Sequence, residues 1–454
     1  MNTNTQWWQD ATFYHIYPLG LCAAPLQNDF KTVNRLDALY PWLDHMQALG
    51  LDSLYLGPIF QSTSHGYDTV DYYQIDNRLG TEADFARFAA ELHRRGLKLI
   101  LDGVFNHVGR DFWAFKDVQT QGEKSAYRDW FQNLRFGGQS PFGDPFEYEG
   151  WQGHHSLVKL NLAHPQVREH LFDAVALWMD QFGIDGLRLD AADCIDLDFL
   201  RALHGFTKSR RSDFWLMGEV IHGDYRQWVN PETLDSVTNY ECYKGLYSSL
   251  AENNYFEIAY ALKRQFGPQG LYQDLLFYNF VDNHDVDRVA SKFEDKALLY
   301  PLYILLFTMP GIPSVYYGSE FGLDAVKEPY SDVSLRPALD LNALESHAPQ
   351  PNLPGVIQRL VELRRQSRAI LWGDYREVWV QPNQLAFLRQ FEGDSALIVL
   401  NSADQPAEIH LAGLPWQGGL LADGLNPGET FRIEDGQLSL TVPPTWGRLL
   451  RWEK

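Results

Sequence analysis

Short apolar β-rich runs recur along this chain of 454 residues and alternate with amphipathic helical segments. The helical pattern is clearest at 82–96 and 164–183. Apolar strands that alternate with such helices are typical of βα units, which form a parallel sheet. Eight runs predict an α/β fold, the closed (β/α)8 TIM barrel, with its active site at the carboxyl ends of the strands. The runs cover residues 13–19, 53–59, 97–105, 184–192, 214–220, 236–240, 275–283 and 313–318.

Two parts of the chain do not follow this alternation. The connection after the third run is long and rich in Gly, Pro and aromatic residues, and long irregular insertions in compact domains are usually functional. We predict a small inserted subdomain there that overhangs the barrel mouth. The last eighty or so residues contain short strands with Gly, Pro and Asn turns, which predict an antiparallel β-sandwich. The predicted domains are the catalytic barrel (1–107 and 162–373), the inserted subdomain B (108–161) and the C-terminal sandwich (374–454).

The net charge of −21 argues against a nucleic-acid or anionic-membrane partner and is compatible with a neutral substrate. The first ten residues, "MNTNTQWWQD", contain neither a basic nor an apolar signal region. The cysteines are odd in number and too widely spaced to indicate a disulfide framework or a zinc site. We therefore expect a cytoplasmic protein, and we make no prediction of its oligomeric state. The three cysteines are Cys22, Cys194 and Cys242.

The stretch 297–318 is uncharged and long enough to cross a bilayer. Proline and glycine at 301, 310, 311 and 313 interrupt it. A short buried helix followed by a buried strand explains this pattern better than a membrane span does.

The run "GLRLDAAD" (186–193) carries an arginine and an aspartate on one face of a predicted strand. Side chains alternate along a strand, so Arg188 and Asp190 point together while Leu187 and Leu189 point away. A buried charged pair is costly unless it is well paired or functional. From this run alone, a structural ion pair and a working pair are equally good explanations.

Other predicted strands also end in charged or polar side chains. Each of these could be a turn, a helix cap or a satisfied core histidine by itself. Their common position at one end of the barrel favours an active site instead. They are Asp102, Asn106 and His107 after the third strand, Glu219 after the fifth, and His284 and Asp285 after the seventh.

The ordered segments "DGVFNH", "GLRLDAAD", "GEV" and "FVDNHD" resemble the four signature regions of the α-amylase superfamily, glycoside hydrolase family 13. "HGYDTVDYY" (65–73) and "GIPSVYYGSE" (311–320) are similar to further segments of that family. The similarity covers essentially the whole chain. It implies a retaining α-glucoside hydrolase that cleaves α-1,4 bonds of maltooligosaccharides, cyclodextrins or related α-glucans through a covalent glycosyl-enzyme.

The resemblance also implies roles for individual residues. Asp190 resembles the nucleophile, Glu219 the general acid/base, and Asp285 the third carboxylate that binds ring hydroxyls. Arg188 is expected to keep Asp190 ionised and aimed, whereas Asp102 and Asn106 resemble scaffold. The expected substrate-binding residues are Tyr67, Asp68, His107, Lys159, Arg188, His222, His284 and Arg288.

Two segments are similar to the neopullulanase/cyclomaltodextrinase group. "VKLN" (158–161) contains Lys159 where many other amylases have an aspartate, and "GEVIH" ends in His222. Lys159 could equally be a solvated loop lysine. Two features depart from the group: its usual N-terminal β-domain is not seen before the first strand, and region four reads "DNHD".

The same positions bear on calcium, which many amylases hold between the barrel and the subdomain. Calcium takes oxygen ligands, and the Lys159 ammonium is not a ligand. Cys194 also replaces a histidine whose carbonyl serves the ion in those enzymes. We therefore expect no cofactor and no metal, with calcium chemically possible but not predicted at this site. "GHH" (153–155) lacks a third ligand for a transition metal.

Two other functions remain open at this point. A 4-α-glucanotransferase would use the same residues with a sugar as acceptor. A non-catalytic glucan-binding protein is also compatible with the fold, although such proteins typically lose a carboxylate and this chain has all three.

Overall fold

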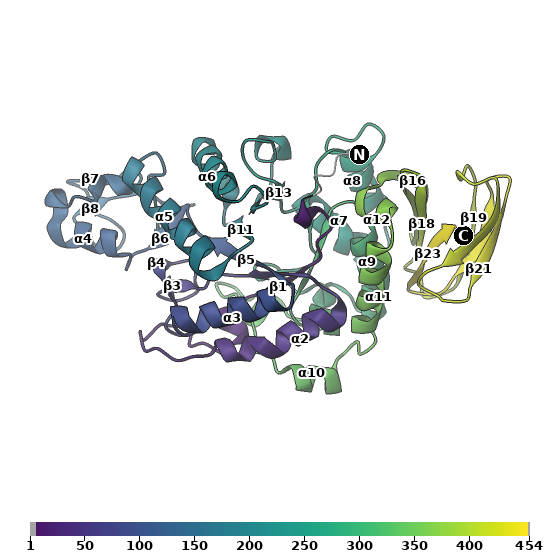
Figure 1. Cartoon of the computed structure of the whole chain (residues 1–454), viewed down its shortest axis with the longest axis horizontal. Coiled ribbons are helices and arrows are strands. Elements are labelled where there is room, and N and C mark those ends of the chain that lie inside the picture. Colours follow the sequence, from purple (N-terminus) through teal and green to yellow (C-terminus); the bar gives the residue numbers. More distant parts are fainter. Residues whose placement is uncertain (1–5, 453–454) are drawn as a thin grey trace.

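The computed structural model describes residues 6–452, and a parallel eight-stranded barrel occupies its centre (Figure 1). All eight predicted runs contain a barrel strand, so the predicted fold is confirmed. The strands are β1 (Phe13–Ile16), β2 (Ser53–Leu56), β5 (Lys98–Gly103), β11 (Gly186–Leu189), β12 (Trp215–Gly218), β13 (Ser236–Val237), β14 (Tyr278–Asn279) and β15 (Ile312–Tyr316).

The sheet closes on itself. Its strands pair in parallel in the order β13-β12-β11-β5-β2-β1-β15-β14. An isolated parallel bridge between Thr238 and Tyr278 joins the two ends of this order. Closure leaves no free sheet edge and makes all the strand carboxyl ends face one mouth.

Alternation along the strands separates two cores. Ile100 on β5 and Met217 on β12 belong to an inner cluster with aromatic residues of β1, β2 and β14. Leu99, Leu187 and their outward neighbours pack against the helices instead. The barrel interior is therefore an apolar plug beneath the mouth, as the two-residue period of a strand requires.

Helices surround the barrel, and the segments predicted as helical at 82–96 and 164–183 form α3 and α5. Apolar faces of these helices cover the outward side chains of the strands. The helices outside the inserted subdomain are α1 (Pro18–Leu21), α2 (Tyr40–Leu49), α3 (Glu82–Arg94), α5 (Pro165–Phe182), α6 (Leu197–Arg210), α7 (Tyr240–Ala251), α8 (Phe256–Phe266), α9 (Leu299–Thr308), α10 (Leu341–His347), α11 (Leu353–Arg365) and α12 (Arg368–Trp372).

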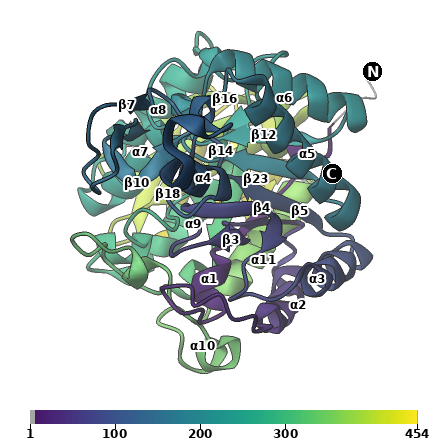
Figure 2. The ribbon, with the colours of Figure 1, turned by 90° about the vertical axis from the view of Figure 1, so that its left-hand side faces the viewer.

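Two excursions rise from the strand ends. A hairpin after β2, absent from our sequence-based prediction, places a turn beside the mouth. After β5 the chain forms the inserted subdomain, which lies in front of the barrel in Figure 2. The hairpin consists of β3 (Phe60–Ser62) and β4 (Thr69–Ile75); the subdomain contains β6 (His107–Gly109), α4 (Trp113–Gln121), β7 (Arg135–Phe136), β8 (Phe146–Glu147), β9 (Gly150–Trp151) and β10 (His154–Lys159).

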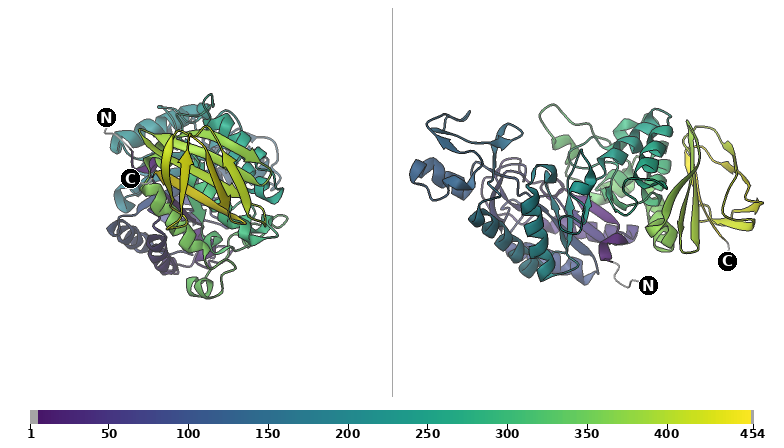
Figure 3. Two further views of the ribbon diagram at one scale, coloured as in Figure 1. Left: turned by 90° about the vertical axis from the view of Figure 1, so that its right-hand side faces the viewer. Right: turned by 90° about the horizontal axis from the view of Figure 1, so that it is seen from above.

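The C-terminal antiparallel sandwich lies at the opposite end of the molecule from the subdomain (Figure 3). It has its own apolar core. The domain boundaries expected from the sequence stay a prediction. The strands are β16 (Asp374–Gln381), β17 (Gln384–Phe391), β18 (Asp394–Asn401), β19 (Ala407–Leu411), β20 (Gly418–Asp423), β21 (Thr430–Glu434), β22 (Leu438–Val442) and β23 (Trp446–Trp452).

The uncharged stretch 297–318 forms the buried helix α9 and the barrel strand β15. The short buried helix and buried strand predicted for that stretch are confirmed. Within residues 6–452, no helix combines the length and apolarity needed to cross a bilayer.

A buried arginine joins the sandwich to the barrel. Arg389 on β17 donates to the Thr308 carbonyl at the end of α9 (2.6 Å) and to the Gly373 carbonyl (2.8 and 3.2 Å). Burial lowers the pKa of Arg389 to about 9, which still leaves it charged at neutral pH. The C-terminal end of a helix is a favourable place for such a cation.

We expect Arg389→Met to lower the free energy of unfolding by about 2–4 kcal/mol, because both carbonyl groups lose a buried donor. Urea denaturation measures this loss. Arg368→Met is the matched control, since Arg368 is exposed and pairs with exposed Glu392; it should change stability by less than about 0.5 kcal/mol. Equal effects of the two substitutions would contradict the assignment.

Candidate active site

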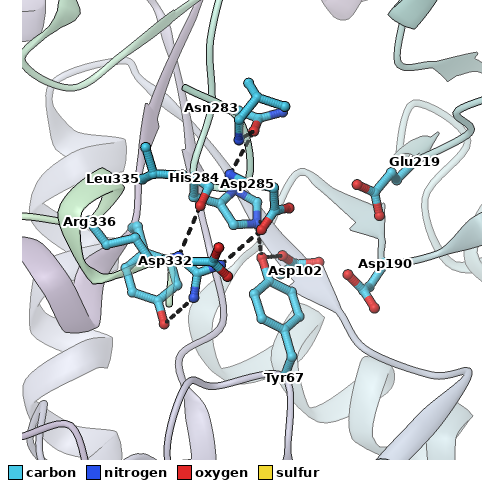
Figure 4. Close-up of polar contacts among 12 residues, drawn as sticks. Tyr67, Asp102, Asp190, Glu219, Asn283, His284, Asp285, Asp332, Leu335 and Arg336 are labelled. Atoms are coloured by element: carbon cyan, nitrogen blue, oxygen red, sulfur yellow. Dashed lines mark hydrogen bonds and ion pairs between the residues drawn. The ribbon is translucent and has the colours of Figure 1, made fainter. Parts of the chain in front are cut away.

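The barrel mouth brings together the charged residues predicted from the strand ends (Figure 4). Asp102 lies on β5 and Arg188 on β11, and the two are paired neighbours in the sheet register. Asp190 and Glu219 each follow directly after a barrel strand. Asp285 follows β14 and lies across the mouth from them.

One guanidinium links three of the carboxylates. Nη1 of Arg188 lies 2.9 Å from Oδ1 of Asp102 and 2.9 Å from Oδ1 of Asp190, and Nη2 lies 2.9 Å from Oε2 of Glu219. The Arg188 side chain is only 4 % exposed. The contacts with Asp102 and Asp190 are charge-assisted hydrogen bonds and that with Glu219 is an ion pair, so one cation holds all three carboxylates.

A turn of the backbone also holds Glu219. Ala191, next to Asp190, adopts left-handed geometry with φ 46° and ψ 44°. This conformation costs a non-glycine residue about 1–2 kcal/mol. It presents the Ala191 N–H to Oε2 of Glu219 at 3.0 Å, and strained residues of this kind cluster at functional sites.

Asp190 has a raised pKa. Burial is the main cause, and the charges of Glu219, Asp102 and Asp285 add to it, while Arg188 opposes the shift. Arg188 favours the ionised form of Asp190, as expected, but burial outweighs this effect in the free protein, since one cation is shared among three carboxylates.

The pKa of Asp285 shifts in the opposite direction to that of Asp190. Burial alone would raise it, but His284 and Arg336 hold the pKa well below its usual range. Nε2 of His284 lies 2.9 Å from Oδ2 of Asp285, and Nη2 of Arg336 donates to Oδ1 at 2.8 Å. Asp285 stays ionised and, with 33 % of its side chain exposed, is open to a ligand.

His107 supplies a neutral polar group. Burial is the main cause that lowers its pKa to about 3. Its Nε2 lies 3.9 Å from Oδ2 of Asp190 and has no hydrogen-bond partner within the described residues 6–452. The ring of Trp151, from the subdomain, lies 5.5 Å from the imidazole. An unpartnered ring nitrogen beside Asp190 is suited to a ligand hydroxyl.

The turn between β3 and β4 places Tyr67 at the mouth. Its ring stacks on His284 at 5.4 Å and 10°, and its hydroxyl contacts Nε2 of His284 and Oδ2 of Asp102 (3.1 Å). Asp68, expected to bind substrate, instead accepts a hydrogen bond from Ser64 at 2.6 Å. Asp68 therefore stabilises the turn that carries Tyr67.

Lys159 and His222 lie farther from the carboxylates. Lys159 on β10 forms an ion pair with Glu149 at 2.8 Å. His222 is exposed three residues after Glu219 and makes no hydrogen bond within residues 6–452. Their roles in substrate binding stay predictions.

The expected contact of Arg288 with substrate is wrong. Arg288 is 0 % exposed, and its guanidinium donates to the Tyr317 carbonyl (2.8 Å), the Ser319 hydroxyl (3.0 Å) and the Leu335 carbonyl (3.3 Å). Arg288 is only three residues from Asp285, but its side chain turns away from the mouth and into the protein.

Two contact residues escaped the sequence-based prediction. Tyr240 at the start of α7 donates to Oε1 of Glu219 at 3.4 Å, and Arg336 contacts Asp285. Tyr240 ends the predicted run 236–240, three residues after β13, so its place at a strand end was a signal that the prediction did not use. Arg336 offers no such signal, because "SLRPAL" around it has no motif that points to a site.

The residues at the junction of barrel and subdomain, where calcium was judged possible but not predicted, do not fit the ion. Asn106 offers one buried oxygen without a partner, but the nearby side chain on β10 is the Lys159 ammonium. Over residues 6–452, no group of three or more His, Cys, Asp or Glu side chains has the arrangement that a metal needs.

Comparison with known proteins agrees with this arrangement. Residues 29–347 match the model of the family described as alpha amylase, catalytic domain. The chain belongs to the α-amylase family. It is therefore a glycoside hydrolase by family, as its sequence predicted. Residues 377–446 of this α-amylase family member match the maltogenic amylase C-terminal domain.

Individual relatives align over nearly the whole chain. It is 32 % identical to neopullulanase 2 of Thermoactinomyces vulgaris, with 99 % of this chain and 78 % of the relative covered. It is 30 % identical to a cyclomaltodextrinase of a Bacillus species, over 87 % and 73 %. The structure of the cyclic α-maltosyl-(1→6)-maltose hydrolase of Arthrobacter globiformis matches with a TM-score of 0.83 at 28 % identity, over 99 % and 100 %. The predicted likeness to the neopullulanase/cyclomaltodextrinase group is confirmed.

The raised pKa of Asp190 predicts that its ionised form destabilises the folded state at neutral pH. A carboxyl group with a raised folded pKa contributes stability below its unfolded pKa and loses it as the pH rises through the folded pKa. Asp190→Asn removes this buried negative charge, while Arg188 still forms ion pairs with Asp102 and Glu219. We expect the variant to be more stable than the parent at pH 7, on the order of 1 kcal/mol, with the gain vanishing near pH 4. Thermal unfolding at the two pH values measures it.

Asp285→Asn is the matched comparison and should have the opposite sign. The pKa of Asp285 is lowered, so its carboxylate contributes stability above its unfolded pKa. The variant should be less stable than the parent at pH 7. Destabilisation by both substitutions at pH 7 would contradict the charge distribution described for the mouth.

Proposed function

We propose that this chain is a retaining hydrolase of α-1,4-glucosidic bonds in maltooligosaccharides, cyclodextrins or related α-glucans. The observation that carries the proposal is the Asp190–Glu219 pair, whose carboxylates each lie 2.9 Å from the same guanidinium of Arg188. A retaining glycosidase needs two adjacent carboxyl groups, one protonated and one ionised. The names of the relatives support the substrate class.

Each side chain has a defined task in this mechanism. An oxygen of Asp190 attacks the anomeric carbon as the bond to the leaving oxygen breaks, and Glu219 gives its proton to that oxygen. Glu219 then takes a proton from water, the water oxygen attacks the same carbon, and Asp190 is released.

The charged and neutral neighbours assist this chemistry. Asp285, permanently ionised, accepts hydrogen bonds from ring hydroxyls and stabilises the positive charge that develops on the sugar. His107 and His284 offer ring nitrogens to hydroxyls of the same sugar, and Tyr67 presents its ring beneath it. Arg188 keeps Asp190 and Glu219 at fixed positions while the proton moves.

We also propose that the enzyme works in the cytoplasm. A relative of Bacillus subtilis, 28 % identical over 76 % of this chain, is named an intracellular maltogenic amylase. All three cysteines are free thiols, which is compatible with a reducing compartment.

Hydrolysis with retention is the expected outcome on a panel of maltotriose, β-cyclodextrin, pullulan and starch. Proton NMR of early products should show the α-anomer before mutarotation. Asp190→Asn and Glu219→Gln should each lower kcat by at least about 10³-fold. The control is Lys263→Gln at an exposed position of α8, and this variant should retain activity. Early β-anomer would refute retention, and products longer than the substrate at low concentration would indicate a transferase.

We propose that activity needs no calcium at the junction of barrel and subdomain, because Lys159 and Glu149 already form an ion pair there. A chelator should leave kcat and the thermal midpoint unchanged. Lys159→Asp supplies a carboxylate in place of the ammonium, and calcium should raise the thermal midpoint more in this variant than in the parent. Loss of parent activity on chelation, restored by calcium, would contradict the proposal.

A further inference from the structure

A strap of chain, residues 323–336, lies against the segment that carries Asp285. It follows the turn η9 (Ser319–Phe321) and contains the single turn η10 (Val333–Leu335). Most of its side chains are exposed or half-buried, and Tyr330 is fully exposed. An irregular, exposed segment of this length would not be expected to support a catalytic carboxylate unless specific contacts hold it.

Two cations of the strap contact Asp285, one at its carboxylate and one at its main-chain carbonyl. Arg336 donates from Nη2 to the Asp285 carboxylate at 2.8 Å and from Nε to the His284 carbonyl at 3.0 Å (Figure 4). Lys327 donates from Nζ to the main-chain carbonyl of Asp285 at 3.2 Å. The strap therefore fixes both the side chain and the backbone of this residue.

A single carboxylate ties the two cations together. Oδ1 of Asp332 lies 2.9 Å from Nζ of Lys327, and Oδ2 accepts from Nη2 of Arg336 at 2.9 Å. Asp332 and Arg336 flank η10, so this turn sets their spacing. Ionised groups that share partners in this way hold one another's geometry.

The strap is anchored beneath this ion cluster. The Arg288 N–H donates to the Ala325 carbonyl at 2.9 Å, and the buried Arg288 side chain donates to the Leu335 carbonyl. The Lys327 N–H donates to Asp287 at 2.7 Å. This anchoring explains why Arg288 turns away from the mouth.

The Arg336 side chain lies behind Asp285 with only 9 % of its surface exposed, against 33 % for Asp285. It stacks over the Tyr17 ring at 4.6 Å. Because Arg336 is covered and Asp285 is open, Arg336 acts on a ligand through the carboxylate it orients.

We propose that Arg336 is a positioning residue for Asp285 and that Asp332 and Lys327 hold it in place, so that the strap sets the geometry of the third carboxylate. The proposal rests on the function proposed above. Oriented by two donors, the carboxylate meets the sugar hydroxyls without reorganising at the moment of reaction.

Several other groups share the surroundings of Asp285 and stay unchanged when Arg336 is replaced. They act on its titration together with the strap. They are His15 from β1, His65 and Tyr67 from the β3–β4 turn, Arg188 and Asp190 from the β11 end, Tyr240 from α7, and His284 beside Asp285 itself.

The experiment compares Arg336→Gln with the parent on maltotriose. We expect kcat to fall about 10²-fold with KM changed by less than about 5-fold. Arg336→Lys should rescue part of this loss, because it restores a cation beside Asp285. A purely structural role would lower the amount of folded enzyme and would show no such dependence on the cation.

Three further variants separate charge from geometry. Arg336→Lys should recover part of kcat, since a cation remains beside Asp285. Asp332→Asn and Lys327→Met should each lower kcat by about 3- to 10-fold with the cation of Arg336 still present. The matched control is Lys244→Met, which removes an exposed cation on α7 that pairs with Glu257 at 2.5 Å and should stay within about 2-fold of the parent.

The proposal is overturned if Arg336→Gln stays within about 3-fold of the parent in kcat, or if it loses kcat and Arg336→Lys recovers none of it. Should Arg336→Gln fail to fold, Arg336→Lys and Asp332→Asn decide, and parental kcat in both overturns it. An inactive parent on every α-glucan would instead refute the proposed function, and this inference with it.

Discussion

The buried guanidinium of Arg188 is the interaction on which the mouth of the barrel depends. Burying one cation with three carboxylates is unfavourable unless each charge is met by well-aligned partners. The pairing of β5 with β11 places Asp102 beside Arg188, and the pairing of β11 with β12 leads the chain to Glu219. A shift of one residue in either register would turn these side chains out toward the helices.

The rest of the barrel supports that register. Gly218 ends β12 where an added Cβ would lie 2.7 Å from the Cβ of Ala192 and 2.5 Å from Leu234. Only glycine therefore lets the chain reach Glu219 at this depth. The apolar plug beneath the mouth excludes water from the base of the charged cluster, and a lower local dielectric strengthens each ion pair within it.

The sequence predicted those features that depend on local periodicity. The eight strands, α3 and α5, and the charged residues that end strands β5, β11 and β12 all followed from spacing and from the rule for barrel mouths. The prediction that Arg288 binds substrate was wrong because proximity in sequence to Asp285 does not fix the direction of a side chain. Tyr240 ends the predicted run 236–240 and could have been found by the same rule, whereas Arg336, 51 positions after Asp285, contacts the site only through tertiary packing. No pattern within "SLRPAL" indicates that Arg336 contacts Asp285.

Asp190 and Asp285 show how neighbouring cations give two aspartates pKa values that shift in opposite directions. Burial raises the pKa of Asp190, and Arg188 does not offset it because Asp190 shares this cation with Asp102 and Glu219. Asp285 faces His284 and an arginine shared with one other carboxylate, so its pKa falls. The barrel strands set the first balance, whereas His284 and the strap after β15 set the second. The proposed nucleophile and the carboxylate proposed to bind the sugar are thus held by separate parts of the chain. Arg336 contacts neither Asp190 nor Glu219, so a change in the strap acts on that pair only through the charge of Asp285.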